Sequence, residues 1–150
     1  ITLGNKIISK NEDVAVENLV QERVDYFTSL AQAKKVTLEY EILNHAVLYI
    51  DRAKFSKLLD NLLSNAIKYN TIHGTVVVRV DTHVLEVEDT GIGIESKDIV
   101  HMQERYTRFN KSSGGFGIGL SIVSEIAKEY KLEVEISSVI HEGTKVRIVW

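Results

Sequence analysis

The sequence contains no cysteine and no proline. The absence of cysteine excludes disulfide scaffolds, thiolate metal sites and thiol catalysis. The absence of proline argues against a proline-rich linker between several domains. No apolar run approaches the roughly 20 residues that a membrane-spanning helix needs, and no signal-peptide pattern is present. We therefore expect a cytoplasmic protein that makes no direct membrane contact.

An excess of charge of one sign is also missing. The sequence has 18 Lys and Arg against 21 Asp and Glu, which gives a net charge of -3. Bulk electrostatics therefore indicate neither nucleic acid nor an anionic membrane as a partner. The chain does have 150 residues with 44% hydrophobic content, which suits one domain with a proper core. Residues 1–13 are polar and weakly patterned, and we expect them to be the remnant of a linker before a domain of residues 14–150.

Helical and strand patterns alternate irregularly along the chain. Apolar residues recur at helical spacing over 17–34, over a segment that follows a suitable N-cap at Asp51, and over a segment that residues 115–119 open. The patterns typical of strands cover 36–42, 46–50, 75–80, 84–88, 132–136 and 146–150. Because 75–80 and 84–88 are joined by a short polar turn, they are predicted to form a hairpin. An α+β two-layer sandwich fits this mixture better than a doubly wound parallel sheet.

The helix predicted after Asp51 carries a polar stripe. Asn61, Asn65 and Lys68 stand at i, i+4 and i+7, within roughly 60° of one another on the edge of the apolar face. Asparagine is not favoured inside helices, because its amide competes for backbone hydrogen bonds. The stripe indicates a charged ligand, with amide oxygens for a hard cation and an ammonium for phosphate. A solvated helix face with chance spacing explains it equally well.

Two glycine-rich segments follow. Asp89 precedes Gly91 and Gly93 at a strand end, where glycines let the backbone approach a flat ligand and a carboxylate can accept from the exocyclic amine of adenine. The alternative is a strand-end turn with a capping aspartate. Residues 115–119, GFGIG, stand where a loop becomes a helix, a place where backbone N–H groups hold phosphate. Glycines there can also serve only helix–sheet packing. The segment matches neither GxGxxG nor GxxxxGK[ST].

In combination and in this order, four segments resemble the catalytic, ATP-binding domain of bacterial sensor histidine kinases, a branch of the GHKL superfamily that also contains gyrase, Hsp90 and MutL ATPases. NLLSNAIKY is similar to the N box of the family, DTGIGI to its first glycine box, RYTRFNKS to its F box region and GGFGIGLSIV to its second glycine box. The segment HEGT at 141–144 is similar to the closing glycine-threonine segment. The resemblance covers residues 14–150. It implies the GHKL (Bergerat) ATP-binding fold, a two-layer α/β sandwich with a mixed sheet of five or more strands on three helices.

The resemblance implies a role for each matching residue. Asn65, with Asn61 beside it, would hold Mg²⁺, and Lys68 would meet the phosphates of ATP; these three are the candidate catalytic residues. Asp89 would read the adenine amine. The other implied nucleotide-binding residues are Tyr69, Gly91, Gly93, Ile94, Tyr106, Arg108, Lys111, Gly115, Phe116, Gly117, Ile118, Gly119, Leu120 and Thr144. The F box region departs from the family pattern, because Gln103 stands where phenylalanine is common.

Asn61 separates a kinase from a hydrolase. GHKL enzymes that hydrolyse ATP typically carry a glutamate four residues before the Mg²⁺-binding asparagine, and an amide there cannot accept a proton from water. Asp60 points about 100° away around the helix. We therefore expect a histidine kinase; the alternatives are a GHKL ATPase clamp or chaperone-type domain, and a nucleotide-binding pseudokinase.

The phosphate acceptor is expected on another domain. None of the five histidines is followed by an acidic and then a basic residue, the acceptor signature of the family. The resemblance thus implies a histidine-bearing dimerisation domain of the same protein, which residues 1–13 would have joined, and a response regulator downstream. It also implies a homodimeric parent, whereas this fragment alone is expected to be monomeric.

Overall fold

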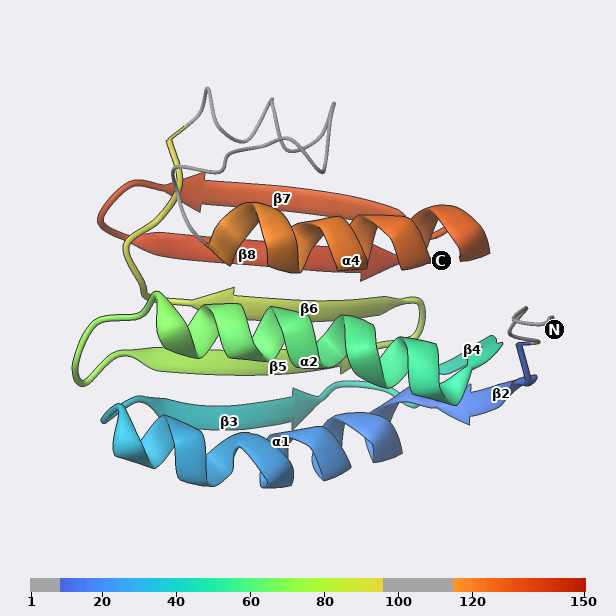
Figure 1. The fold of residues 1–150 in the computed structure, drawn as a ribbon. Helices are drawn as coiled ribbons and strands as arrows, with labels where there is room; N and C mark the ends of the chain where they lie inside the picture. Colours follow the sequence, from blue (N-terminus) through green and yellow to red (C-terminus); the bar gives the residue numbers. More distant parts are fainter. Residues whose placement is uncertain (1–8, 96–114) are drawn as a thin grey trace, which may run out of the picture.

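The computed structural model describes residues 9–95 and 115–150, with side chains for all of these except 115–119. Within these ranges three helices cover one face of a five-stranded sheet, and a second sheet of two strands lies at one end (Figure 1). The elements in chain order are β2 (Asn11–Ala15), α1 (Val16–Ala33), β3 (Thr37–Ile42), β4 (Val47–Asp51), α2 (Arg52–Lys68), β5 (Thr75–Asp81), β6 (Val84–Asp89), α4 (Gly115–Tyr130), β7 (Glu133–Val139) and β8 (Gly143–Val149).

The larger sheet has the strand order β3-β5-β6-β8-β7. Its first pair, β3 with β5, is parallel, whereas β5–β6, β6–β8 and β7–β8 are antiparallel. The hairpin predicted between 75–80 and 84–88 is confirmed as β5–β6. The predicted fold class, an α+β two-layer sandwich with a mixed five-stranded sheet on three helices, is confirmed as well. None of the described helices combines the length and the apolar character needed to cross a bilayer.

The strand β4 does not join this sheet. It pairs antiparallel with β2, from Asn11 opposite Asp51 to Ala15 opposite Val47. The turn before β4 is fixed to the start of α1, because the N–H of Val16 donates to the carbonyl of Ala46 over 2.9 Å. This anchor brings β4 beside the chain that leads into α1. The pairing therefore draws residues 11–13 into a strand ahead of the expected domain start.

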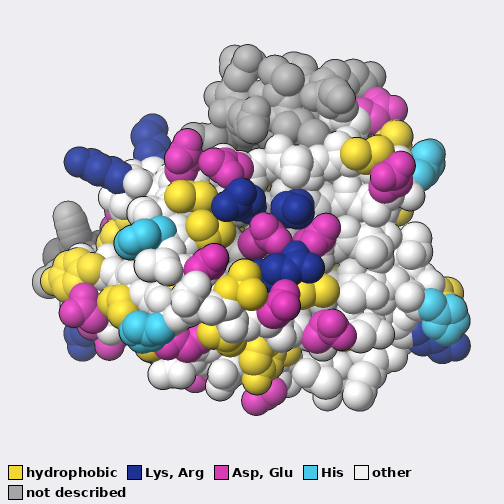
Figure 2. Space-filling model, turned by 180° about the vertical axis from the view of Figure 1, so that it is seen from behind, with side chains coloured by type: hydrophobic (Ala, Val, Ile, Leu, Met, Phe, Trp, Pro, Cys, Tyr) yellow, Lys and Arg dark blue, Asp and Glu magenta, His cyan; other side chains and the backbone are white. Residues whose placement is uncertain are grey.

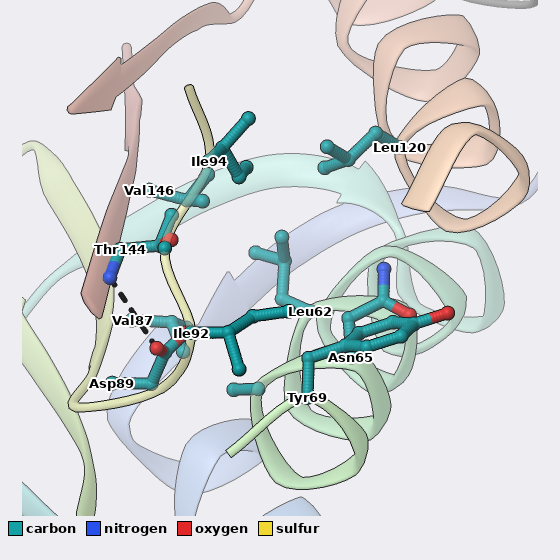
Figure 3. A pocket seen from close by; sticks show the side chains of 12 residues that line it. Leu62, Asn65, Tyr69, Val87, Asp89, Ile92, Ile94, Leu120, Thr144 and Val146 are labelled. Carbon is teal, nitrogen blue, oxygen red and sulfur yellow. Dashed lines mark hydrogen bonds between the residues drawn. The ribbon is translucent and has the colours of Figure 1, made fainter. Parts of the chain in front are cut away.

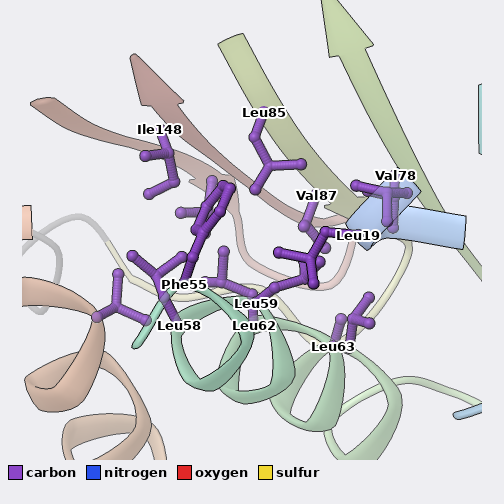
Figure 4. Close-up of a cluster of buried hydrophobic side chains, with 14 of the residues drawn as sticks. Leu19, Phe55, Leu58, Leu59, Leu62, Leu63, Val78, Leu85, Val87 and Ile148 are labelled. Carbon is purple, nitrogen blue, oxygen red and sulfur yellow. The ribbon is translucent and has the colours of Figure 1, made fainter. Parts of the chain in front are cut away.

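Helix α2 forms the centre of the hydrophobic core. Asp51 caps its first turn as predicted, accepting a hydrogen bond of 3.0 Å from the N–H of Lys54. The helix buries one broad face against the sheet, with α1 on one side and α4 on the other. Figure 4 shows side chains of this face, Phe55, Leu58, Leu59, Leu62 and Leu63, directed toward Val78, Leu85, Val87 and Ile148 of the sheet and Leu19 of α1. This burial fixes the rotation of α2 about its own axis.

The opposite face of the sheet carries alternating charges. Figure 2 shows Lys and Arg side chains interleaved with Asp and Glu side chains in the middle of this face. One row of register partners runs across all five strands with the signs − + − + −: Glu41, Arg79, Glu86, Arg147 and Glu135. Arg79 is 3.0 Å from Glu41 and 2.7 Å from Glu86. Because each arginine of the row stands between two glutamates, the charges are paired on this face, which stays solvated while the helical face forms the core.

Replacing Phe55 with alanine tests the central place of α2. The ring is fully buried, so Phe55→Ala should lower the free energy of unfolding by about 3–5 kcal/mol through lost apolar contact and a residual cavity. Urea denaturation measures the change. Tyr49→Ala is the control: its side chain is 62% exposed, and the loss should be about 1 kcal/mol or less. Equal losses for the two variants would contradict this account of the core.

Candidate functional site

A pocket opens between the C-terminal half of α2, the strands β6 and β8, and the first part of α4 (Figure 3). Its walls are mostly apolar, and its polar side chains are few. The lining residues are Leu62, Asn65, Ala66, Tyr69, Val87, Asp89, Ile92, Gly93, Ile94, Leu120, Thr144 and Val146. Such a cavity, with apolar walls and a few convergent polar groups, is typical of a small-molecule site.

Asp89 lies at the end of β6, with one carboxylate oxygen engaged and the other left open. Its Oδ1 accepts hydrogen bonds from the N–H of Gly91 over 2.8 Å and from the N–H of Thr144 over 3.3 Å. Its Oδ2 has no hydrogen-bond partner among the described residues. Burial raises the pKa of Asp89 to about 6, although the two N–H donors act to lower it. The open oxygen can accept a hydrogen bond from a ligand.

Asn65 lies on the other side of the pocket, on α2. Its Nδ2 is buried and has no hydrogen-bond partner within the part of the chain that the structure describes. A buried polar atom without a partner costs about 1–3 kcal/mol, so such atoms in a pocket wall suggest a ligand that completes them. One turn later Tyr69 ends the helix, and its N–H donates to the carbonyl of Asn65 over 3.0 Å.

Asn61 and Lys68 stand on α2 outside the pocket lining. The Nδ2 of Asn61 donates to the carbonyl of Lys57 over 2.7 Å, which leaves its side-chain oxygen for another partner. The ammonium of Lys68 lies 5.4 Å from the centre of the Tyr69 ring, in a cation–π contact. The predicted stripe thus has one member, Asn65, in the pocket wall and two on the neighbouring surface.

The loop after Asp89 needs its glycines for contacts within the protein. A Cβ on Gly91 would lie 2.5 Å from the carbonyl oxygen of Tyr69, and one on Gly93 would lie 2.2 Å from that of Val139. Gly93 also has a φ of +77°, which L side chains rarely adopt. The loop is held against the end of α2 by a 3.1 Å hydrogen bond from the N–H of Ile92 to Tyr69. These glycines therefore position Asp89 by close backbone packing.

Some of the predicted nucleotide-binding residues gather in this pocket and others lie elsewhere. The pocket contains Asn65, Tyr69, Asp89, Gly93, Ile94, Leu120 and Thr144. Gly91 supports the loop beside it. Tyr106, Arg108 and Lys111 lie outside the described residues, as does Gln103. Gly115, Phe116, Gly117, Ile118 and Gly119 form the first turns of α4, and their side chains are not described.

Ser138 supports the site from beside the pocket lining and was missed by sequence reasoning. Its Oγ accepts from the N–H of Ile94 over 2.7 Å, donates to the carbonyl of Gly143 over 2.8 Å and lies 2.8 Å from the Oγ1 of Thr144. It connects the loop after Asp89 to the β7–β8 turn. The only signal in the sequence was the alternation of inward-facing and outward-facing residues along the strand, which places Ser138 on the same face as the apolar Ile136.

The raised pKa of Asp89 predicts how stability depends on pH. The folded protein holds this proton more tightly than the unfolded chain, whose carboxyl has a pKa of 3.8. This contribution to the free energy of unfolding is fully present below pH 3.8 and is lost as the pH rises through about 6. Asp89→Asn keeps an oxygen for the two N–H donors and removes the charge. Without ligand it should be more stable than the unmodified chain by about 1–2 kcal/mol above pH 6, allowing for partial solvent screening.

Urea denaturation at pH 4.5, 6 and 7.5 measures this difference. The gap between the two proteins should shrink toward acid pH. A variant that is less stable at pH 7.5, or a gap that does not change with pH, would contradict the burial of an ionised Asp89.

Comparison with known proteins places the chain in a family. Residues 50–150 match the family of histidine kinase-, DNA gyrase B- and HSP90-like ATPases. The sensor histidine kinase YclK of Bacillus subtilis (strain 168) is 31% identical over 142 residues, which is 89% of this chain and 30% of that protein. The chain thus spans about a third of the length of this relative.

Solved structures share the fold. The catalytic domain of histidine kinase ThkA has a TM-score of 0.76 at 18% identity, covering 93% of this chain and 94% of that one. Full-length ShkA, described in complex with AMPPNP, has a TM-score of 0.75 at 19% identity, covering 95% of this chain and 31% of that one. The chain therefore belongs to the family of histidine kinase-, DNA gyrase B- and HSP90-like ATPases, and within it corresponds to the ATP-binding catalytic domain of sensor histidine kinases.

Proposed function

We propose that this chain binds ATP together with Mg²⁺ in the pocket and donates the γ-phosphoryl group to a histidine on a separate domain of its parent protein. One observation carries the proposal: two polar groups lacking partners face the same apolar pocket, the open Oδ2 of Asp89 on one side and the buried amide of Asn65 on the other. A ligand with an apolar, donor-bearing end and a second end that offers a hydrogen-bond acceptor, such as a phosphate oxygen, would complete both.

Adenine fits the side of the pocket at Asp89. Its flat ring suits apolar walls such as Val87, Ile94 and Val146. Its exocyclic amine donates hydrogen bonds, and the Oδ2 of Asp89 is an acceptor without a partner among the described residues. Guanine presents a carbonyl at that position and would meet the carboxylate with an acceptor. ShkA, a protein of similar fold, is described in complex with AMPPNP, an ATP analogue, which supports an adenine nucleotide as the ligand proposed here.

The side chain of Asn65 fits a role in binding Mg²⁺. The described residues contain no cluster of three or more His, Cys, Asp or Glu that could hold a metal by themselves. Mg²⁺ does not need such a cluster, because it commonly keeps several waters and binds through one or two protein ligands and the substrate phosphates. Asn65 would supply its side-chain oxygen as one ligand and Asn61 a second, and the buried Nδ2 of Asn65 would donate to a phosphate oxygen. Lys68 would turn from Tyr69 toward the phosphates. The ion would neutralise phosphate charge during transfer.

The site favours transfer over hydrolysis, because water would lack a base. The carboxylate of Asp60 is held by Arg23 of α1 through hydrogen bonds of 2.7 and 2.8 Å, so it is directed away from the pocket. Asn61 carries an amide that cannot take a proton at neutral pH. Asp89 is the one carboxylate among the described residues that line the pocket, and it is assigned to binding the adenine ring, so it does not serve as a general base. What the site can still supply is positioning of ATP and neutralisation of the charge on its phosphates. Phosphoryl transfer depends chiefly on these two contributions.

The acceptor histidine is assigned to another domain. The four histidines that the structure describes, at positions 45, 73, 83 and 141, lie outside helices and strands, and none lines the pocket. We therefore assign the acceptor to a dimerisation domain of the same protein, joined through the residues before β2, with a response regulator as the next partner. The parent would be a homodimer in a cytoplasmic setting, and this chain alone a monomer.

Nucleotide identity provides one test. Calorimetry should show binding of ATP and ADP and no comparable binding of GTP. Asp89→Asn should weaken ATP binding about 10- to 100-fold, since a donor then faces the adenine amine. Glu88→Gln, the same change at the neighbouring residue on the open face of the sheet, is the control and should leave ATP affinity nearly unchanged. Equal affinities for ATP and GTP would contradict the assignment of Asp89 to the adenine amine.

Phosphoryl transfer provides the second test. When mixed with the separately expressed dimerisation domain of its parent, the chain should label a histidine of that domain from γ-labelled ATP, and the label should be acid-labile. Asn65→Ala should lower the rate about 100-fold or more by removing a metal ligand. Asn44→Ala, an exposed asparagine that bonds Asp81, is the control. Rapid ATP hydrolysis by the chain alone would indicate an ATPase, and tight ATP binding without transfer would indicate a pseudokinase; either result overturns the proposal.

A further inference from the structure

We propose that Ser138 sets the direction of the Thr144 hydroxyl, so that the base side of the pocket offers only hydrogen-bond acceptors and selects a 6-amino purine over a 6-oxo purine. The inference rests on the proposed function, because it takes the ligand to be a purine nucleotide. Ser138 is a positioning residue, since it acts through Thr144 and does not line the pocket.

The hydroxyl of Ser138 has three partners, which account for its full hydrogen-bonding capacity. A serine hydroxyl can donate one hydrogen bond and accept two. The carbonyl of Gly143, at 2.8 Å, can only accept, so it takes the single hydrogen of Ser138. The N–H of Ile94, at 2.7 Å, can only donate and fills one lone pair. For the 2.8 Å contact with Thr144 to be a hydrogen bond, Thr144 must be the donor.

This assignment leaves Thr144 with no hydrogen for a ligand. Its hydroxyl hydrogen points at Ser138, and the free lone pairs of its Oγ1 remain available on a residue that lines the pocket. The same residue donates its backbone N–H to Asp89 over 3.3 Å, so the two side chains are neighbours (Figure 3). Asp89 adds the open Oδ2. At neutral pH both groups are therefore acceptors.

An acceptor-only site distinguishes purines by their 6-substituent. The exocyclic amine of adenine carries two hydrogens, which suits two neighbouring acceptors. A 6-oxo group brings a third acceptor in place of the amine, and although the adjacent N1–H can donate to one of the two protein acceptors, the other is left facing the carbonyl. If the Thr144 hydroxyl were free to rotate, it could donate to a 6-oxo group and the discrimination would weaken. Ser138 prevents this rotation by holding the hydrogen.

Ser138 also has a structural role, which the experiment must separate. Because it anchors the N–H of Ile94, its loss loosens the loop after Asp89. A looser loop should lower the affinity for all nucleotides by the same factor. The informative quantity is thus the ratio of the affinities for ATP and for ITP, the 6-oxo analogue, measured with the 150-residue chain by competition against a fluorescent nucleotide.

The unmodified chain should prefer ATP to ITP, and Ser138→Ala should lower that ratio about tenfold, the value of roughly one hydrogen bond. Ser137→Ala, on the same strand but on its exposed face, is the matched control and should leave the ratio unchanged. An unchanged ratio in Ser138→Ala, with ATP still preferred, overturns this inference alone. Equal binding of ATP and ITP by the unmodified chain overturns the adenine assignment of the proposed function as well.

Thr144→Val tests whether the hydroxyl accepts or donates a hydrogen bond toward the ligand, and it does so even if Ser138→Ala does not fold. If Thr144 presents an acceptor, removing it should lower the ratio of ATP to ITP affinity. If Thr144 donates into the pocket, the same variant should raise the ratio, and the inference is overturned. In the Thr144→Val background Ser138→Ala should no longer change the ratio, because no hydroxyl is left to orient. A further tenfold change in that background would also contradict the proposal.

Discussion

The apolar face of α2 is buried against the sheet and between two helices, and the position of the pocket follows from that burial. Because five large side chains from Phe55 to Leu63 fix the rotation of the helix, Asn65 has to stand at the edge of the buried face, opposite the end of β6. The helix ends at Tyr69, whose backbone receives the loop after Asp89. Core packing of α2 against the sheet thus sets the positions of both Asn65 and Asp89 in the site.

Asp89 shows how the site trades stability for binding. A carboxylate with one open oxygen in a half-buried place is costly to ionise, which is why the pKa of Asp89 rises to about 6. The two N–H donors on its Oδ1 compensate only in part. An exocyclic amine would supply the missing partner, so the same burial that destabilises the empty domain increases the gain on binding. Strain of this kind is expected at functional sites rather than in the core.

Much of the fold could be predicted because its signals are local. The cap at Asp51, the helical face of α2 and the β5–β6 hairpin each depend on residues close together in sequence, and the structure confirms them. The register of Asn65 on that face puts it in the pocket wall, and its role toward a metal stays a prediction. The pairing of β4 with β2 could not be predicted, because an anchor from α1 to Ala46 decides it. Ser138 was missed for the same reason, since its partners at 94, 143 and 144 meet it only in the folded chain.

The central claim is that one ligand spans the pocket with its base at Asp89 and its phosphates at Asn65. A crystal structure of the chain with a non-hydrolysable ATP analogue and Mg²⁺ tests this most directly. The account predicts the adenine amine about 3 Å from the Oδ2 of Asp89, and the metal in contact with the side-chain oxygen of Asn65. A base bound outside the pocket, or a nucleotide lying with its phosphates at Asp89, would contradict it.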